Sequence, residues 1–374
     1  MLRLDCIVRA SMFKRNYSNT PDLRLIAWEI TRSCNLSCAH CRAPVDGYTE
    51  DELTTEECLS LIDQFAQVGQ PILILSGGEP LLRHDLFHIA DYATQRGLRV
   101  VIGTNGTLIT EDIAARLKEA SILRAAISFD FPIPELHDRF RGKAGAFEAA
   151  MTGITNAQQA GIEVQINSTI TKLNAPFLDD LLALALKVGA VAFHPFLLVP
   201  TGRGKGLKSV QLSAKEREQV LNWFYEKQTE LKHELLFKPT CAPQYQRIVH
   251  QRQKDTDSEN SLFNPLSSVT RGCIAGTAYC FISHQGRVQG CGYLTPEAGN
   301  IRKESFPRIW ANAPLFRQLR DLSHINGKCG ICEYQEVCGG CRARAYEATG
   351  DFLEAEPDCL YQPKREGASV SGRY

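Results

Sequence analysis

The stretch TRSCNLSCAHCRA, residues 31–43, directly follows the short apolar run Arg24–Ile30 and carries Cys34, Cys38 and Cys41 in Cys-x3-Cys-x2-Cys spacing. A cubic iron–sulfur cluster has four irons, so three thiolate ligands leave one iron open to another molecule. Structural zinc sites usually pair their ligands as Cys-x2-Cys or as mixed Cys and His sets. The spacing therefore favours an iron–sulfur cluster with one open position over zinc or reactive thiols.

From Leu23 to about Glu234 the chain alternates short apolar, β-branched runs with amphipathic stretches of helical period, which is typical of βα units on a parallel sheet. We expect strands at Arg24–Ile30, Pro71–Leu75, Arg99–Gly103, Ile122–Phe129, Glu163–Ile170 and Ala190–Val199. We expect helices near Thr54–Gln67, Asp85–Arg96, Glu111–Ala120, Ala146–Ala160, Phe177–Val188 and Ser213–Lys232. The predicted fold class is α/β, a partial (β/α)6 TIM-like barrel, in which chemistry takes place at the carboxyl ends of the strands.

Polar residues follow most of the predicted strands. The second strand runs into Ser76, Gly77, Gly78, Glu79 and Pro80, where glycines allow close approach of a ligand and a carboxylate can receive an amino group. Comparable groups stand at later strands: Thr104, Asn105 and Gly106 after the third, Ser128 and Asp130 at the fourth, and Asn167 and Thr169 in the fifth. Turn or capping roles are the alternative for each of them.

Charge and hydropathy give no sign of a polyanionic or lipid partner. Lys plus Arg equals Asp plus Glu at 42 each, so we expect neither nucleic acid nor a membrane as partner. The first 20 residues lack the apolar core of a signal peptide, and the most apolar stretch, Leu181–Pro200, is interrupted by Lys187, His194 and Pro195. We therefore expect a cytoplasmic protein with one large and one smaller domain.

Fourteen cysteines in a reducing compartment indicate metal binding more than disulfides. Eight stand in residues 273–362, a glycine-rich segment that should bury little core and depend on metal for its fold. These eight are Cys273, Cys280, Cys291, Cys329, Cys332, Cys338, Cys341 and Cys359. The expected organisation is an extension at 1–22, the barrel at 23–238, a connector at 239–272, the cysteine-rich domain at 273–362 and a flexible tail at 363–374.

The cysteine loop, its place after the first strand and the Gly-Gly-Glu-Pro loop one strand later resemble the radical S-adenosylmethionine superfamily. The resemblance implies a [4Fe-4S] cluster on Cys34, Cys38 and Cys41 whose open iron binds the methionine group of the cofactor, which is cleaved to a 5′-deoxyadenosyl radical. It places the methionine amino group on residues 76–80. Further cofactor contacts fall on Asn105, Ser128, Asp130 and Asn167. His40 would stand against the adenine, and an ordinary exposed histidine is the alternative.

The C-terminal cysteines resemble the iron–sulfur domain known as SPASM, whose members carry two fully ligated auxiliary clusters. That resemblance assigns the outer cluster to Cys329, Cys332, Cys338 and Cys359. It assigns the inner cluster to Cys273, Cys280, Cys291 and Cys341. Two residues separate Cys338 from Cys341 where the family usually has three, so Cys241 is a candidate substitute for Cys341. Structural zinc on the Cys-x2-Cys pairs is the alternative.

A closer resemblance covers nearly the whole chain, in blocks such as LIAWEITRSCNLSCAHCRA (25–43), FLLVPTGRGK (196–205) and CFISHQGRVQGCGYL (280–294). These blocks resemble the haem b synthases of the sirohaem-dependent pathway, which are iron-coproporphyrin III oxidative decarboxylases. The family implies that two propionates lose CO2 and become vinyl groups, with an inner auxiliary cluster as acceptor of the electron left over. A ferredoxin or flavodoxin would be the electron donor.

A tetrapyrrole with four propionates requires cations near the barrel mouth. The candidates are Arg141, Lys172, Arg203 and Lys205, although each alone is more often a solvated surface charge. Weaker candidates for contact with the macrocycle or its iron are His194, His284 and Tyr245. Three other functions stay open: a peptide-modifying maturase, an enzyme that removes acetate side chains from 12,18-didecarboxysirohaem, and a non-catalytic electron carrier with three clusters.

Overall fold

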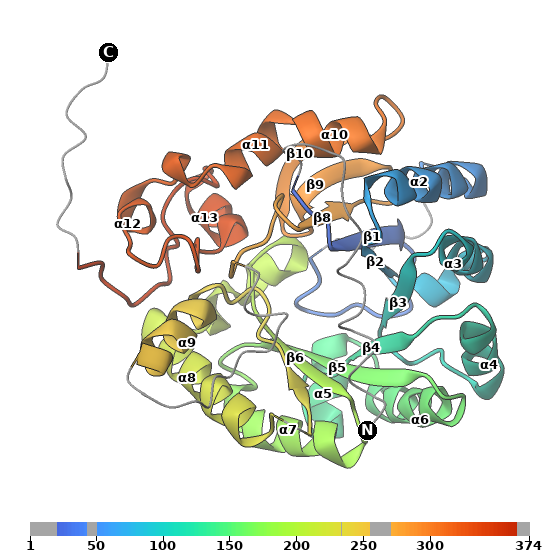
Figure 1. Ribbon diagram of the computed structural model, residues 1–374. Helices are drawn as coiled ribbons and strands as arrows, with labels where there is room; N and C mark the ends of the chain where they lie inside the picture. Colours follow the sequence, from blue (N-terminus) through green and yellow to red (C-terminus); the bar gives the residue numbers. More distant parts are fainter. Residues whose placement is uncertain (1–20, 43–50, 233, 255–270, 365–374) are drawn as a thin grey trace.

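The computed structural model describes residues 21–42, 51–232, 234–254 and 271–364 (Figure 1). The strands are β1 (Leu25–Thr31), β2 (Ile72–Gly77), β3 (Arg99–Thr104), β4 (Arg124–Ser128), β5 (Glu163–Ile170), β6 (Ala192–Leu197), β7 (Leu236–Phe237), β8 (Tyr279–Ile282), β9 (Arg287–Cys291) and β10 (Leu294–Asn300). The helices of the N-terminal part are α2 (Thr55–Val68), α3 (Leu86–Gln95), α4 (Glu111–Glu119), α5 (Pro134–Arg141), α6 (Ala146–Gln159), α7 (Leu178–Lys187) and α8 (Ala214–Glu230). They are followed by α9 (Gln244–Lys254), α10 (Phe306–Asn312), α11 (Pro314–Arg320), α12 (Gly327–Gly330) and α13 (Arg342–Thr349).

Within the described residues one sheet runs through the molecule in the order β10-β9-β8-β1-β2-β3-β4-β5-β6-β7. Neighbours from β8 through β1 to β7 are parallel, whereas β8, β9 and β10 pair antiparallel. Helices α2, α3, α4, α6 and α7 follow one another around the outside of this curved sheet (Figure 1). Because these strands are parallel, their carboxyl ends lie at one end of the sheet. The loops that follow them, from the one after Thr31 to the one that contains Thr201, therefore gather there.

The six predicted strands and six predicted helices are all present, with ends that differ by at most two residues. Side-chain caps explain two of the sharpest boundaries. Thr54 and Glu57 form a capping box at the start of α2, and Ser213 and Glu216 form another at the start of α8. Helix α5 was not predicted, because its sequence PELHDRFR has no apolar repeat and begins with proline.

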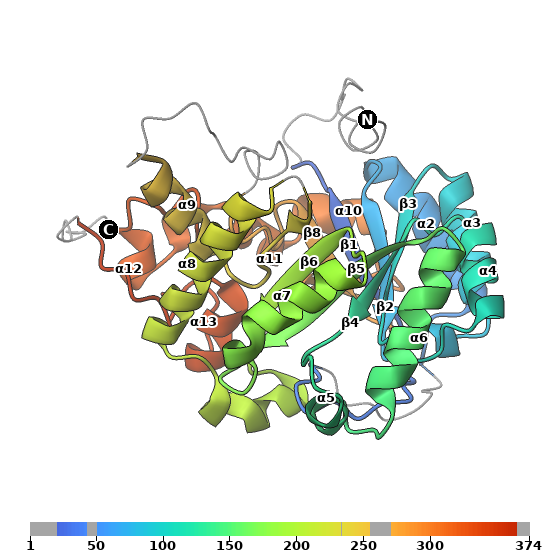
Figure 2. The same cartoon turned by 90° about the horizontal axis from the view of Figure 1, so that it is seen from below.

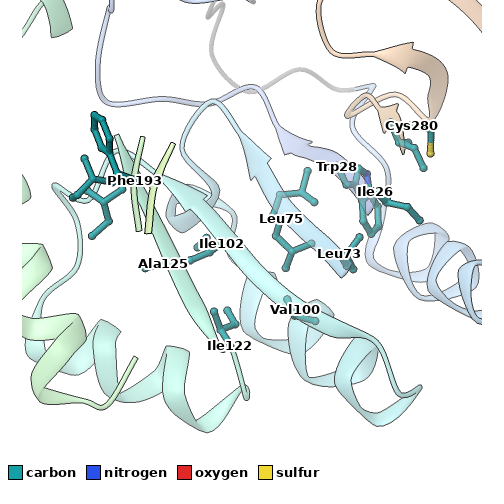
Figure 3. Close-up of a cluster of buried hydrophobic side chains, with 14 of the residues drawn as sticks. Ile26, Trp28, Leu73, Leu75, Val100, Ile102, Ile122, Ala125, Phe193 and Cys280 are labelled. Atoms are coloured by element: carbon teal, nitrogen blue, oxygen red, sulfur yellow. The ribbon is translucent and has the colours of Figure 1, made fainter. Parts of the chain in front are cut away.

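The expectation that the C-terminal segment buries little core is wrong for its first half. Strand β8 pairs in parallel with β1, so the hairpin β8–β9 and strand β10 extend the barrel sheet. Helices α10 and α11 then cover this extension with Phe306, Ile309, Trp310 and Phe316, all fully buried. Figure 3 shows how Cys280 of β8 joins Ile26 and Trp28 of β1 in the same apolar core. Pairing to an existing sheet supplies the buried surface that the segment lacks by itself.

The far end of the C-terminal segment is fastened to the barrel by buried charge. Arg344 of α13 lies 2.8 Å from Glu356, and Arg217 of α8 lies 3.6 Å from the same carboxylate and 2.9 Å from Asp358. This network joins α8 to α13, which lie on the same side of the molecule when it is seen from below (Figure 2). Residues 1–20 of the predicted extension (1–22), 255–270 of the connector (239–272) and 365–374 of the predicted tail (363–374) lie outside the described residues.

No helix in the described ranges has the length and apolar character to cross a membrane. The thirteen cysteines in the same ranges form no disulfide.

Candidate metal and cofactor sites

Cys34, Cys38 and Cys41 lie together just beyond β1, in a small apolar cluster around Leu36. Two N–H groups point at sulfur. The amide of Leu36 donates to Cys34 Sγ over 3.4 Å, and Arg141 Nη1 donates to Cys38 Sγ over 3.7 Å. Hydrogen bonds of this kind stabilise thiolates that bind iron and adjust the reduction potential of a cluster. The loop therefore holds three neighbouring sulfurs, and those of Cys34 and Cys38 accept hydrogen bonds.

No group of three His, Cys, Asp or Glu side chains in the described ranges is arranged tightly enough for a single metal ion. Cysteines that bind separate irons of one cube stand farther apart than ligands that share one ion.

The loop after β2 packs directly on the cysteine loop. The amide of Gly78 donates to the carbonyl of Thr31 over 2.8 Å, and the amide of Glu79 donates to the carbonyl of Ser33 over 2.7 Å. A Cβ at Gly78 would lie 2.2 Å from the oxygen of Ser33, and one at Gly77 would lie 2.4 Å from that of Thr31. Glycine is therefore required at both positions for the two loops to touch.

The carboxylate of Glu79 is fully buried next to the cysteine loop. It accepts hydrogen bonds from the amides of Leu81 and Asn105, over 3.2 and 2.8 Å, and from the hydroxyl of Thr104 over 2.8 Å. Burial raises the pKa of Glu79 to about 7, and no cation among the described residues offsets this rise. A buried carboxylate without a cationic partner fits a ligand that brings an amino group, as S-adenosylmethionine does.

Two other predicted cofactor residues, Asn105 and His40, lie at the cysteine loop: Asn105 bonds to it and His40 is part of it. Asn105 Nδ2 donates to Asn35 Oδ1 over 2.8 Å. His40 stacks on Phe140 with 4.6 Å between ring centroids. Burial lowers the pKa of His40 to about 4, despite the opposing effect of Asp130, so the ring is neutral at pH 7. A neutral ring suits the predicted contact with adenine.

The remaining predicted cofactor residues stand on β4, on β5 and just after β4. Ser128 and Asn167 are register partners of the two strands. Asp130 is fully buried, lies 2.6 Å from Arg141 Nη2 and accepts the amide of Thr169 over 2.7 Å. Burial acts to raise the pKa of Asp130, but Arg141, His40, His137 and the amide of Thr169 together outweigh it and the pKa is lowered. The pair Asp130–Arg141 is therefore ionised inside the protein.

The four predicted substrate cations fall into two groups. Arg141 and Arg203 hold the cysteine loop: besides the contacts of Arg141, the amide of Arg203 donates to the carbonyl of Cys41 and its Nε to that of Cys38, each over 2.9 Å. Lys172 and Lys205 are more exposed. Lys172 lies 3.5 Å from Glu216, and Lys205, whose side chain is 66% exposed, lies 3.4 Å from Glu347. The lysines thus keep exposed charge, whereas the arginines are engaged with protein.

The three weaker candidates are placed in different surroundings. His284 Nδ1 lies 2.7 Å from Glu29 Oε1, and the hydroxyl of Tyr245 bonds to Gln228, so both are occupied within the protein. His194 Nδ1 lies 3.0 Å from Gln165 Nε2, while its Nε2 is buried without a hydrogen-bond partner in the described residues.

Cys329, Cys332, Cys338 and Cys359 line one small cavity in the C-terminal part. The amide of Gly340 donates to Cys338 Sγ over 3.5 Å, and the amide of Glu356 donates to Cys329 Sγ over 3.3 Å. These four sulfurs therefore surround a common space, in the combination that the sequence assigned to the outer cluster.

A second group of cysteines is formed by Cys273, Cys291, Cys341 and Cys241. The pKa of Cys241 is raised by burial and then by repulsion from Cys291, Cys341 and Cys273, so the four sulfurs are near neighbours. The short spacing from Cys338 to Cys341 is accommodated by Gly339 and Gly340, which have φ of 73° and 61° and turn the chain between the two groups. The structure does not bring Cys280 to this group.

A buried charged pair beside the cysteine loop was missed in the sequence. Arg42 Nη2 lies 2.7 Å from Glu29 Oε2, and the guanidinium stacks on the ring of Phe281 at 4.3 Å. Tyr279 and Tyr293 stand nearby, since Arg42 opposes the burial-driven rise in the pKa of both phenols. The signal was present as the glutamate inside the otherwise apolar strand LIAWEIT, residues 25–31.

The fold and the cysteine loops define the chain as a radical S-adenosylmethionine enzyme with an iron–sulfur domain at its C-terminal end. Residues 28–185 match the Radical SAM superfamily, and residues 273–342 match the iron–sulfur cluster-binding domain SPASM. SuiB of Streptococcus suis, solved with its precursor peptide SuiA, has the same fold with a TM-score of 0.72, 16% identity and coverage of 92% of this chain and 77% of that chain.

More specifically, the chain belongs to the family of AdoMet-dependent haem synthases. It is 50% identical to the "AdoMet-dependent heme synthase" of Methanosarcina barkeri, over 93% of this chain and 99% of the relative. The protein of that name from Oleidesulfovibrio alaskensis is 49% identical, over 94% and 90%. The "Fe-coproporphyrin III synthase" of Methanosarcina barkeri, at 34% identity over 91% and 88%, is more distant.

Proposed function

We propose that this protein is a radical S-adenosylmethionine haem synthase that converts two propionates of Fe-coproporphyrin III into vinyl groups, giving haem b. The observation that carries the proposal is the identity of about one half to haem synthases over nearly the full length of both chains. A protein named for making Fe-coproporphyrin III shares only 34% of its residues. The difference favours a chain that consumes this porphyrin over one that produces it.

In this proposal Cys34, Cys38 and Cys41 hold the catalytic [4Fe-4S] cluster, and Ser76–Pro80 with Asn105, Ser128, Asp130, Asn167 and His40 hold S-adenosylmethionine. When bound, cluster and cofactor would supply the radical chemistry that takes a hydrogen atom from a propionate, with CO2 released and the remaining electron passed to an auxiliary cluster. The protein's own contribution is orientation. Arg141 and Arg203 fix the cysteine loop through Cys38 and Cys41, and the contact of Gly78 with Ser33 sets the cofactor loop against it.

The substrate carries four carboxylates, so cations near the mouth of the barrel are required. Lys205 belongs to the loop TGRGK, whose Gly202 and Gly204 pack on the backbone of Arg42 and His40. That loop therefore borders the cysteine site, and Lys205 is the candidate we favour for a propionate. Lys172 is a second candidate, and its pairing with Glu216 leaves more than a third of its side chain exposed.

The same proposal includes two auxiliary clusters in a SPASM-type domain at 273–362, following the barrel at 23–238 and the connector at 239–272. A ferredoxin or flavodoxin supplies electrons, and the protein works in the cytoplasm, where its thiols stay reduced. Neither nucleic acid nor a membrane is a partner.

The test is anaerobic incubation of the reconstituted enzyme with S-adenosylmethionine, a reductant and Fe-coproporphyrin III, followed by chromatography and mass analysis of the tetrapyrrole. Loss of two carboxyl groups, formation of two vinyl groups and release of 5′-deoxyadenosine are the expected result. If deoxyadenosine forms while the porphyrin stays intact, the substrate assignment fails. The next substrates are then 12,18-didecarboxysirohaem and peptides.

A further inference from the structure

We propose that Cys241, and not Cys280, is the fourth protein ligand of the inner auxiliary cluster, together with Cys273, Cys291 and Cys341. The inference rests on the proposed function only in assuming that an inner cluster is present. It concerns which thiols of this chain surround that cluster.

The alternation of side chains along β8 and β9 separates Cys280 from Cys291. Ile26 and Trp28 of β1 are register partners of Cys280 and Ile282 of β8, and all four side chains are fully buried. Partners in a parallel pair point to the same face, so Cys280 faces the helix-covered side of the sheet. On β9, Cys291 is two residues from Gln289, the partner of Phe281. Cys291 consequently shares the opposite face with Phe281.

Contacts of the neighbouring glycine support this division. Gly290, one residue before Cys291, would place a Cβ 2.7 Å from the side chain of Leu319 in α11. Its empty side therefore faces α11, on the same side as Cys280, whose burial-driven rise in pKa is opposed by Arg320 at the end of α11. Figure 3 shows Cys280 among the apolar side chains of this core. A cluster of four irons has no room there, because Cys280 is fully enclosed by packed protein.

Cys241, unlike Cys280, is not enclosed in the apolar core. It follows a short extension of the sheet next to β6, in which the amide of Thr240 donates to the carbonyl of Pro195 over 2.8 Å and the carbonyl of Thr240 accepts the amide of Leu197 over 3.0 Å. Cys241 then turns with φ of 53°. Like Cys273 and Cys291 it keeps some accessible surface although it lies deep in the protein, as expected of residues that line an internal space.

The positions of the other two proposed ligands, Cys273 and Cys341, are set by backbone hydrogen bonds. The amide of Cys273 donates to the carbonyl of Cys338 over 3.1 Å, and the amide of Gly272 donates to that of Val337 over 2.7 Å. Cys341 is the N-cap residue of α13, and its amide donates a hydrogen bond to Glu356 over 2.7 Å. A Cβ at Gly272 would lie 2.5 Å from the carbonyl oxygen of Pro243, so the segments that carry Cys273 and Cys241 pack against each other. Besides burial, repulsion from Cys291, Cys341 and Cys273 raises the pKa of Cys241, whereas no cysteine raises the pKa of Cys280.

This assignment has a structural consequence. Cys291 stands on β9, near one edge of the sheet, and Cys241 follows β7 at the other edge. A cluster bound to both would join the two edges of an open sheet, and its binding energy would contribute to holding the barrel closed.

The experiment uses the full-length protein, reconstituted anaerobically, with iron and sulfide counted per chain and EPR spectra recorded after reduction. The variants are Cys241→Ala, Cys280→Ala and, as a reference for a lost ligand, Cys291→Ala. We expect Cys241→Ala to match Cys291→Ala, either losing up to about a third of the iron or keeping it with a changed inner-cluster signal. Cys280→Ala should keep the iron content and spectrum of the unaltered protein.

The opposite pattern, in which Cys280→Ala matches Cys291→Ala and Cys241→Ala leaves the spectrum unchanged, would overturn the assignment. If Cys241→Ala does not fold, Cys241→Ser keeps the side-chain volume and supplies an oxygen ligand, which should shift the reduction potential of the inner cluster. An unchanged potential in that variant also overturns it. These readouts need no porphyrin, so failure of the haem synthase proposal would leave them interpretable.

Discussion

Arg42 and Glu29 form an ion pair of 2.7 Å in which the glutamate is almost fully buried, and His284 lies 2.7 Å from the other oxygen of the same carboxylate. Burial alone would raise the pKa of Glu29, but Arg42 and then His284 lower it to about 2. Arg42 directly follows Cys41, Glu29 is in β1, and His284 is in the turn from β8 to β9. One carboxylate thus joins the cysteine loop to both parts of the molecule.

Replacing Glu29 with Gln should destabilise the protein by about 3–5 kcal/mol, because Arg42 would stay buried without its partner charge. The measurement is chemical unfolding of the reconstituted protein under anaerobic conditions. The exposed pair Arg124–Glu163 is the control, since Glu163→Gln should cost less than about 1 kcal/mol. Equal effects of the two substitutions would contradict the role given to Glu29.

Gly78→Ala should disrupt the cysteine loop, because the added methyl group would stand 2.2 Å from the carbonyl oxygen of Ser33. We expect loss of the catalytic cluster and at least a tenfold fall in deoxyadenosine formation, of the order seen when a site is displaced. Iron content and deoxyadenosine are the readouts. Gly206→Ala is the matched control, since a Cβ there meets no atom within 4 Å. Normal cofactor cleavage by Gly78→Ala would refute the close contact.

Binding of S-adenosylmethionine should strengthen as pH rises through about 7, because Glu79 is then ionised and can accept from the amino group. The pKa of Glu79 is raised from 4.5 to about 7. The free energy of unfolding of the cofactor-free protein should therefore fall by about 3 kcal/mol as the pH rises from 4.5 through 7. Thermal unfolding with and without cofactor, between pH 6 and about 8, measures this linkage. Glu79→Gln should bind S-adenosylmethionine more weakly and without this pH dependence. Cofactor affinity that does not change with pH in the unaltered protein would contradict the role given to Glu79.

Cys38→Ala should abolish deoxyadenosine formation, since two thiolates remain where three are required.

Cys332→Ala should retain part of the cofactor cleavage but block vinyl formation. Cys58→Ala is the control: Cys58 is buried on α2 beside Arg83 and belongs to none of the three cysteine groups, so both reactions should persist. Full vinyl formation by Cys332→Ala would remove the outer cluster from the reaction.

Lys205→Ala should raise the KM for Fe-coproporphyrin III severalfold and leave kcat nearly unchanged, as expected when a contact is equal in ground and transition states. Lys208→Ala, an exposed lysine in the same loop, should change neither value. The two variants are compared at low ionic strength, where charge contributes most. Identical KM values would exclude Lys205 as a propionate contact.

The sequence by itself determined the barrel and its cysteine loop. Strand and helix periods are local properties of β1 to β6 and their helices, and they predicted every boundary within two residues. The three-cysteine spacing and the Gly77–Gly78 pair are equally local. The outer group of Cys329, Cys332, Cys338 and Cys359 was also assigned from spacing, by resemblance, and its members share one cavity.

Only the tertiary structure decided what depends on pairing between distant segments. The parallel pairing of β8 with β1 joins residues some 250 positions apart, and the period of two along β8 then turned Cys280 into the core and left the interior face to Cys291. Arg141 and Arg203 were expected at the substrate, but they are engaged with the cysteine loop because the chain folds back over it. Register and long-range contact leave no signature in spacing, since a shift of one residue reverses which face a side chain occupies.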